Sequence, residues 1–126
     1  MSDQISILIV DDHSVVRQGI KAFLVTQPGL HIVGEADSGE EAIRLTEKLV
    51  PDIVLMDLLL PGMSGIEATR QIKKISPRTQ VIVLTSYHED EHIFPALRAG
   101  AISYILKDIR SRDLIEIIYK AAQGES

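Results

Sequence analysis

The sequence has no cysteine among its 126 residues, which excludes disulfide bonds and thiolate metal sites and fits a reducing compartment. It also has no excess of basic residues. The formal net charge is -5, and direct binding of nucleic acid needs a basic surface. No apolar run approaches the roughly 18 residues of a membrane helix. The first residues also lack the charged and then apolar pattern of a signal peptide. We therefore expect a cytoplasmic protein that makes no contact with a membrane.

Short apolar segments alternate with longer amphipathic ones along the chain. The apolar segments predict five strands, at Ile5–Val10, His31–Ala36, Ile53–Met56, Val81–Leu84 and Ser103–Leu106. The first, third and fourth are rich in Ile, Val and Leu, which is typical of central parallel strands covered on both faces. The second contains Gly34 and Glu35, so we expect it and the fifth at the edges of the sheet.

The amphipathic segments predict five helices, at Ser14–Thr26, Ser38–Val50, Ser64–Ile75, Glu89–Ala99 and Ser111–Gln123. The second and third open with serine followed three residues later by glutamate. This is the spacing of a capping box, in which each side chain accepts a hydrogen bond from the other residue's backbone N–H. Ser111 is expected to cap the last helix. Pro95 lacks a backbone donor and should kink or shorten the fourth helix.

This order of elements predicts an α/β fold, a flavodoxin-like (βα)5 doubly wound parallel sheet with strand order 2-1-3-4-5. The order places the topological switch point between the first and third strands. The length allows one domain. We assign it residues 1–123 and interpret residues 124–126 as the start of a linker.

Polar residues follow four of the predicted strands directly. They are Asp11 and Asp12, Asp57, Thr85 and Lys107. The C-terminal ends of parallel strands meet at one edge of the sheet, so these side chains should converge in one cleft. Three neighbouring carboxylates repel one another unless a cation is present, and magnesium prefers oxygen ligands of this kind. The pattern therefore predicts a magnesium and phosphate site.

The residue types suggest roles in phosphoryl transfer. Asp57 would attack phosphorus as a carboxylate nucleophile, and the backbone carbonyl of Leu59 is well placed as a further magnesium ligand. Lys107 would supply a positive charge and Thr85 a hydroxyl donor. Each residue alone has an ordinary explanation as a helix cap, a turn residue or solvated surface. The interpretation depends on their coincidence at one edge. His13 lies beside the acid pair Asp11 and Asp12 and could touch the metal, but we expect it to face solvent from the first helical turn.

Several motifs together carry a family resemblance. They are VDDH at Val10–His13, LMDLLLPGMSGIE at Leu55–Glu67, LTS at Leu84–Ser86, AGA at Ala99–Ala101 and SYILKD at Ser103–Asp108. The chain resembles, over essentially its whole length, the receiver domain of bacterial two-component response regulators. Its opening VDDHSVVRQGI and its ILKD are most similar to the subfamily with a C-terminal LuxR-type helix-turn-helix output domain.

The resemblance implies a signalling switch that catalyses only its own phosphoryl transfer and a slow autodephosphorylation. Asp57 would be the phosphoacceptor for a sensor histidine kinase. Asp11 and Asp12 would bind Mg²⁺, Thr85 and Lys107 would contact the phosphoryl group, and Tyr104 would be the switching aromatic residue. Transcription would be controlled through a DNA-binding domain absent from this chain. The alternative is a stand-alone receiver that signals by direct protein contact without DNA.

Two features depart from this family pattern. Many receivers have proline after the lysine, with a cis peptide. Here Asp108 follows, and a cis non-proline bond costs roughly 3–4 kcal/mol. Leu59 and Tyr87 are bulky and neither is a carboxylate that could orient water, so we expect a long-lived phosphoryl group.

In the last helix, Ile115, Tyr119 and Ala122 form a second apolar stripe. It indicates either a wide core-facing surface or a homodimer interface.

Three other functions of such a fold are disfavoured. A flavin-binding module needs a Ser, Thr or Gly-rich loop after the first strand, where this chain has two aspartates and a histidine. A dinucleotide-binding enzyme needs G-x-G-x-x-G after a strand, which the sequence lacks. A phosphatase that forms an aspartyl phosphate usually needs a second acid at the position of Leu59.

Overall fold

The computed structural model describes residues 4–86 and 90–125. Five parallel strands form one sheet in the order β2-β1-β3-β4-β5. The strands are β1 Ile5–Val10, β2 Leu30–Ala36, β3 Ile53–Asp57, β4 Gln80–Thr85 and β5 Ser103–Leu106. The predicted strand order and both predicted edge strands are confirmed, with boundaries that differ by a single residue at most.

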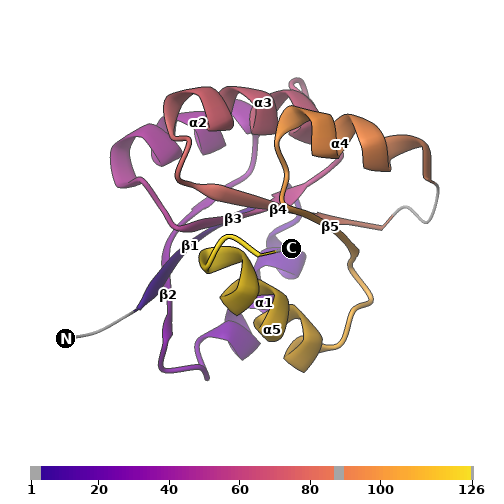
Figure 1. Ribbon diagram of the computed structural model, residues 1–126. Coiled ribbons are helices and arrows are strands. Elements are labelled where there is room, and N and C mark those ends of the chain that lie inside the picture. The colour runs from indigo at the N-terminus through magenta and orange to yellow at the C-terminus, as the bar shows by residue number, and fades with distance from the viewer. Residues whose placement is uncertain (1–3, 87–89, 126) are drawn as a thin grey trace.

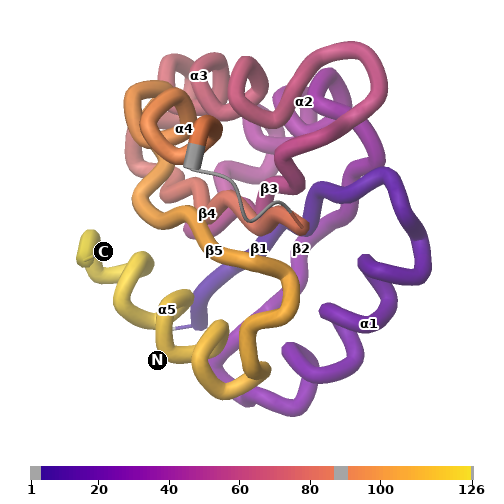
Figure 2. The backbone as a smooth tube through the Cα atoms, turned by 90° about the vertical axis from the view of Figure 1, so that its right-hand side faces the viewer, coloured from indigo at the N-terminus to yellow at the C-terminus, as the bar shows by residue number. Residues whose placement is uncertain are grey.

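Helices cover both faces of the sheet. They are α1 Ser14–Leu24, α2 Gly39–Leu49, α3 Gly65–Ile75, α4 Ile93–Ala99 and α5 Ser111–Ala122, with a short 3-10 turn, η1 Asp90–His92, before α4. Helices α2, α3 and α4 lie on one face and α1 and α5 on the other (Figure 1), and the view from the side shows the same three layers (Figure 2). No helix within residues 4–86 and 90–125 is long and apolar enough to cross a membrane.

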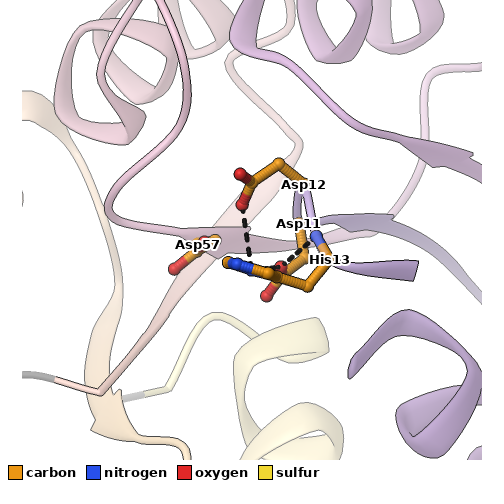
Figure 3. A group of neighbouring side chains, drawn as sticks. All are labelled: Asp11, Asp12, His13 and Asp57. Atoms are coloured by element: carbon orange, nitrogen blue, oxygen red, sulfur yellow. Dashed lines mark hydrogen bonds and ion pairs between the residues drawn. The ribbon is translucent and has the colours of Figure 1, made fainter. Parts of the chain in front are cut away.

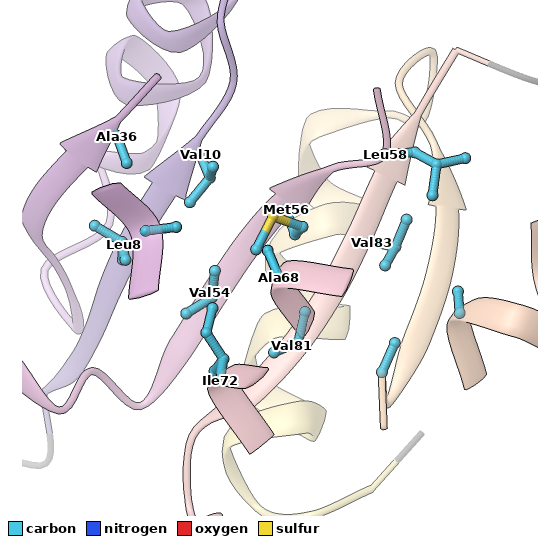
Figure 4. Close-up of a cluster of buried hydrophobic side chains, with 13 residues drawn as sticks. Leu8, Val10, Ala36, Val54, Met56, Leu58, Ala68, Ile72, Val81 and Val83 are labelled. Carbon is cyan, nitrogen blue, oxygen red and sulfur yellow. The ribbon is translucent and has the colours of Figure 1, made fainter. Parts of the chain in front are cut away.

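The core consists of two apolar clusters, one on each face of the sheet. Successive side chains of a strand point to opposite faces, so Val54 and Met56 join the cluster under α2 to α4, whereas Ile53 and Leu55 join the cluster over α1 and α5. Figure 4 shows the first of these clusters. Because both faces are buried, the central strands contain consecutive apolar residues, as the sequence indicates.

Serine caps begin α2 and α3 as predicted, but the capping boxes are only half formed. The Oγ of Ser38 accepts a hydrogen bond from the Glu41 N–H at 3.2 Å, and Ser64 accepts from the Glu67 N–H at 3.1 Å. The Glu41 carboxylate bonds with Arg44, not with the serine backbone, and the Glu67 carboxylate likewise pairs with the arginine three residues after it. An arginine one turn further along the helix therefore competes successfully for the glutamate.

The predicted cap of the last helix is wrong. Arg110 occupies the N-cap position of α5 with extended backbone angles (φ -68°, ψ 145°), and its side chain makes no capping hydrogen bond. Ser111 is already the first helical residue, so its hydroxyl is not at the cap. Asp113 remains in the first turn, where its charge complements the positive end of the helix dipole.

Helix α4 is short, as Pro95 indicated. The predicted start at Glu89 lies outside the described residues, and the regular helix begins only at Ile93, after the 3-10 turn. Pro95 is therefore in the first turn, where a missing backbone donor costs no helical hydrogen bond. Gly100 ends the helix with φ 114°, a conformation that favours glycine.

The second apolar stripe of α5 is divided between core and surface. Ile115 packs against the cluster over α1 and α5, so this part of the stripe belongs to the core. Tyr119 and Ala122 are exposed. The wide core-facing surface that the sequence left open therefore accounts for part of the stripe.

Candidate functional site

The polar residues predicted for the site lie at the C-terminal edge of the sheet, whereas Tyr104 lies within β5. Asp11 follows β1, Asp57 and Thr85 are the last residues of β3 and β4, and Lys107 follows β5. The strand register aligns Val10 with Met56, so Asp11 and Asp57 leave neighbouring strands at the same height. This is the switch point of the sheet, where helices on opposite faces leave the edge open.

Three carboxylates and one imidazole form a compact cluster there. Asp11, Asp12, His13 and Asp57 each offer one ligand atom, and these atoms lie within 4.8 Å of one another (Figure 3). Asp11 is 2% exposed and Asp57 6%, whereas Asp12 reaches solvent. Buried carboxylates this close need a compensating cation, and hard oxygen donors suit magnesium. The residues present therefore fit a divalent cation of this kind.

Lys107 brings a positive charge to the carboxylates of the site. Its Nζ lies 2.7 Å from Asp11 Oδ2 and 3.2 Å from Asp57 Oδ1. Burial alone would lower the pKa of Lys107, but the hydrogen bond with Asp11 and the charge of Asp57 outweigh it, so the pKa is raised above its ordinary value. The ammonium therefore stays charged at neutral pH.

The electrostatics around Asp57 favour an additional cation. Burial and the neighbouring charge of Asp11 raise the pKa of Asp57, and Lys107 offsets this only in part. One ammonium is thus too little positive charge for the carboxylates that surround it. A bound divalent cation would supply the missing charge.

His13 belongs to the cluster, beside the acid pair as the sequence indicated, although the preferred expectation was only that it faces solvent. The exposure prediction is correct, because two thirds of the side chain faces solvent. However, its Nδ1 lies 3.2 Å from Asp11 Oδ1 and 3.1 Å from Asp12 Oδ1. The His13 N–H also donates to Asp11 Oδ1 at 2.9 Å. This is an Asx turn, in which an aspartate accepts from the backbone two residues on, and the sequence Asp11-Asp12-His13 was the available signal.

A cavity of about 260 Å³ opens beside Asp57. His13, Asp57, Leu59, Ser86 and Lys107 line it. Leu59 therefore lies beside Asp57, with half of its surface exposed. The cavity places a half-exposed apolar side chain and an ammonium next to the Asp57 carboxylate.

Thr85 and Tyr104 lie on the neighbouring strands β4 and β5. Thr85 is 1% exposed, and its carbonyl accepts a hydrogen bond from the Lys107 N–H at 2.8 Å. Tyr104 packs against the cluster under α2 to α4, with its hydroxyl oxygen buried. The peptide between Lys107 and Asp108 is trans, and Tyr87 lies outside the described residues.

A tightly packed glycine supports the loop that follows Asp57. The Gly65 N–H donates to the Leu58 carbonyl at 2.9 Å. A Cβ at position 65 would lie 2.2 Å from the Asp57 carbonyl oxygen, so no other residue fits without moving the backbone. The start of α3 thereby holds the end of β3 in place.

Known proteins resemble this chain closely. A family model described as the response regulator receiver domain matches residues 7–119. The response regulator protein VraR of Staphylococcus aureus is 48% identical over 122 residues, which are 97% of this chain and 58% of VraR. The transcriptional regulatory protein LiaR of Bacillus subtilis is 45% identical over 121 residues, 96% of this chain and 57% of LiaR. The chain thus spans a little over half the length of these relatives.

One solved structure adds a comparison of the fold. It is described as a two-component response regulator of the LuxR family from Aurantimonas sp.. It superposes with a TM-score of 0.92 at 36% sequence identity, covering 97% of this chain and 87% of that one. The similarity thus extends from the sequence to the arrangement of all the elements.

Proposed function

The chain belongs to the receiver domain family of two-component response regulators, and from this membership we propose that Asp57 accepts a phosphoryl group from a sensor histidine kinase. One observation carries the proposal. The Asp57 carboxylate is buried beside an open cavity, 3.2 Å from the Lys107 ammonium. A nucleophile, a positive charge and room for a phosphoryl group therefore coincide.

The proposed step is a phosphoryl transfer between two side chains. A carboxylate oxygen of Asp57 attacks the phosphorus of the kinase phosphohistidine. A P–O bond forms while the P–N bond breaks, and the histidine nitrogen keeps the electron pair and takes a proton from water. Lys107 lies within reach of the transferred oxygens, and the hydroxyl of Thr85 lies at the end of the neighbouring strand. The product is an acyl phosphate on Asp57.

Magnesium is the proposed cofactor. The carboxylates of Asp11, Asp12 and Asp57 and the backbone carbonyl of Leu59 would hold it, in agreement with the oxygen-rich cluster at the edge of the sheet. When bound, it neutralises negative charge on the phosphoryl oxygens. Lys107 alone cannot do so, because it already pairs with Asp11.

Phosphorylation would act on the surface around α4 and β5. The acyl phosphate adds negative charge and three strong acceptor oxygens beside Lys107 and the end of β4. Thr85 and Tyr104 are the proposed switch residues, because they connect this edge with the packing under α4. The phosphoryl group shifts the population of two states only through its different contacts in each.

Self-association is the first proposed output. Tyr119 and Ala122 are the exposed part of the second stripe of α5, and we propose that they contribute to a symmetric homodimer of the phosphorylated form. Ala122→Glu should keep the phosphorylated form monomeric in sedimentation velocity experiments, since it places a charge on that surface without disturbing the core. Dimerisation of the phosphorylated variant at wild-type protein concentrations would argue against this surface.

Transcription control is the second proposed output, and it concerns a longer protein. We propose that residues 124–126 begin a linker to a LuxR-type DNA-binding domain, in a cytoplasmic protein. LiaR, which is longer, is named a transcriptional regulatory protein. The receiver itself carries a net charge of -5 and is a poor ligand for DNA. A full-length protein that fails to bind DNA in either state would favour the alternative, a stand-alone receiver that contacts proteins.

Intact mass spectrometry tests the proposed step. The protein is incubated with a small acyl phosphate donor, with magnesium or with a chelator, beside Asp57→Ala. We expect one added phosphoryl group that requires both magnesium and Asp57. If the wild-type protein gains no mass although it binds magnesium, the proposal is wrong and the chain is a degenerate receiver.

A further inference from the structure

Arg17 of α1 reaches from its helix to the backbone of Asp11, which with Asp12 forms the acid pair of the site. Its Nη1 donates to the main-chain carbonyl of Asp11 at 2.6 Å, and its Nε donates to Glu35 Oε1 at 3.0 Å. Only 18% of the Arg17 side chain is exposed. The rigid fork of a guanidinium suits two partners at fixed positions, and lysine has no equivalent geometry. The orientation of Arg17 is therefore well defined.

Glu35 holds the guanidinium in place. It lies on the edge strand β2, and its second oxygen accepts from Lys21 Nζ at 2.6 Å. Lys21 is one turn after Arg17, so two cations of α1 clamp a single carboxylate. The hydrogen bond with Lys21 is the main cause of the lowered pKa of Glu35, with Arg17 contributing in the same direction. The carboxylate therefore stays ionised and keeps both partners.

The backbone of Asp11 is fixed on both sides. Its N–H donates to the Ala36 carbonyl at 3.1 Å, and its carbonyl accepts from Arg17. That carbonyl belongs to the peptide group that joins Asp11 to Asp12. Its direction thus sets the direction from which the Asp12 side chain leaves the backbone. Within residues 4–86 and 90–125, the ion pair given for Asp12 is with the mostly exposed imidazole of His13, a weak restraint, so the direction set by this peptide matters for its position.

We propose that Arg17 is a positioning residue for the magnesium site, acting through the Asp11–Asp12 peptide. This inference rests on the proposed function, because it assumes that the two carboxylates bind the cation. Arg17 touches neither the cation nor the phosphoryl group. It orders the loop so that both carboxylates converge before the cation arrives, which removes an ordering cost from binding.

The sign of the effect separates positioning from simple electrostatics. Arg17 is a cation beside an anionic site, so its removal would strengthen the binding of Mg²⁺ if charge alone mattered. If Arg17 positions the acid pair, its removal weakens binding. Loss of an outer partner of this kind typically weakens metal affinity by roughly 10–100-fold. The two explanations therefore predict opposite shifts of the dissociation constant.

Calorimetric titration with Mg²⁺ tests this on Arg17→Ala, Arg17→Lys and wild type. We expect the dissociation constant to rise about tenfold or more in Arg17→Ala and less in Arg17→Lys, which keeps the charge and one hydrogen bond. In phosphorylation by an acyl phosphate donor, the magnesium concentration for half-maximal rate should rise in parallel, while the rate at saturating magnesium stays near the wild-type value. If Arg17 had only a structural role, its removal would lower thermal stability without raising the magnesium concentration needed for half-maximal rate.

Arg44→Ala is the matched control. Arg44 lines the same 440 Å³ cavity as Arg17 but is exposed and pairs with Glu41 on its own helix. Its removal should leave the dissociation constant within about twofold. If Arg17→Ala does not fold, Arg17→Gln carries the same prediction with a longer polar side chain. Unchanged or tighter Mg²⁺ binding in a folded Arg17 variant overturns the inference. Failure of the wild-type protein to bind Mg²⁺ or accept phosphate overturns the proposed function itself.

Discussion

Replacing Asp57 with asparagine, its neutral isostere, should stabilise the protein in the absence of divalent ions. The Asp57 carboxylate lies within 4.8 Å of ligand atoms of Asp11 and Asp12, and 3.2 Å from Lys107. At an effective dielectric constant of about 20, two like charges at 4.8 Å repel by about 3.5 kcal/mol, and the pair with the ammonium gains about 5 kcal/mol. Two repulsions therefore exceed one attraction by about 2 kcal/mol, before the cost of burying the charge.

Asp57→Asn removes this charge and keeps the shape of the side chain. Its amide oxygen can still accept a hydrogen bond from Lys107, which retains its ion pair with Asp11. We expect the free energy of unfolding to rise by about 2 kcal/mol. For a domain of 126 residues this is an increase of about 7 °C in Tm. Differential scanning calorimetry in a chelating buffer measures it, with the exposed Asp37→Asn as the control for loss of a surface charge.

The effect should depend on pH with a defined sign. The pKa of Asp57 is raised in the folded protein, mainly by burial and then by Asp11, above an ordinary value of 3.8. The folded state thus binds the proton more readily than the unfolded state, and the penalty is complete only above the folded pKa. The advantage of Asp57→Asn should therefore shrink as pH falls through that pKa towards 3.8. A variant less stable than wild type at pH 7 without divalent ions would refute this reasoning.

Three further predictions concern other residues. Leu59→Asn should accelerate loss of the phosphoryl group, because a polar side chain at the cavity can orient water. Intact mass spectrometry measures the half-life of the phosphorylated form. An unchanged half-life in the variant, or loss within seconds in the wild-type protein, would contradict a long-lived phosphoryl group. Gly65→Ala should lower the free energy of unfolding in urea by about 3 kcal/mol, since its Cβ would meet the Asp57 carbonyl; unchanged stability would contradict this close packing. Glu35→Gln should lower the free energy of unfolding by about 1 kcal/mol at pH 7, because it weakens the interaction with Lys21. The effect is modest because the pair is partly exposed and solvent screens it. Because the pKa of Glu35 is lowered, this contribution should be lost as pH falls through the folded pKa, and a difference that persists at pH 2 would contradict it.

The sequence was sufficient to predict the sheet because its signals are local and repeated. Apolar segments such as Ile53–Leu55 need cover on both faces, and this requirement with the strand-helix alternation leads to the observed strand order. The convergence of Asp11, Asp57 and Lys107 follows from the same topology, since each stands at the C-terminal end of a strand. These predictions depend only on where the strands end.

Predictions that depend on competition between neighbours were less accurate. The Glu41 carboxylate bonds with Arg44 and not with the serine backbone, although the capping-box spacing is present. Serine is a residue type typical of N-caps, but the extended backbone of Arg110 makes Arg110 the N-cap, one residue before Ser111. His13 bends back to the acids through an Asx turn that exposure alone would not predict. In each case several partners are within reach, and only the three-dimensional arrangement decides between them.

The most direct test of the central claim is to locate the modification on the chain. The protein would be treated with an acyl phosphate donor and magnesium, reduced with borohydride to convert any aspartyl phosphate to homoserine, and mapped by tandem mass spectrometry. We predict homoserine at position 57 in wild type, with Asp11 and Asp12 unmodified, and none when magnesium is chelated. Modification at another residue, or none at Asp57 in protein that binds magnesium, would contradict the assignment of Asp57 as the phosphoacceptor.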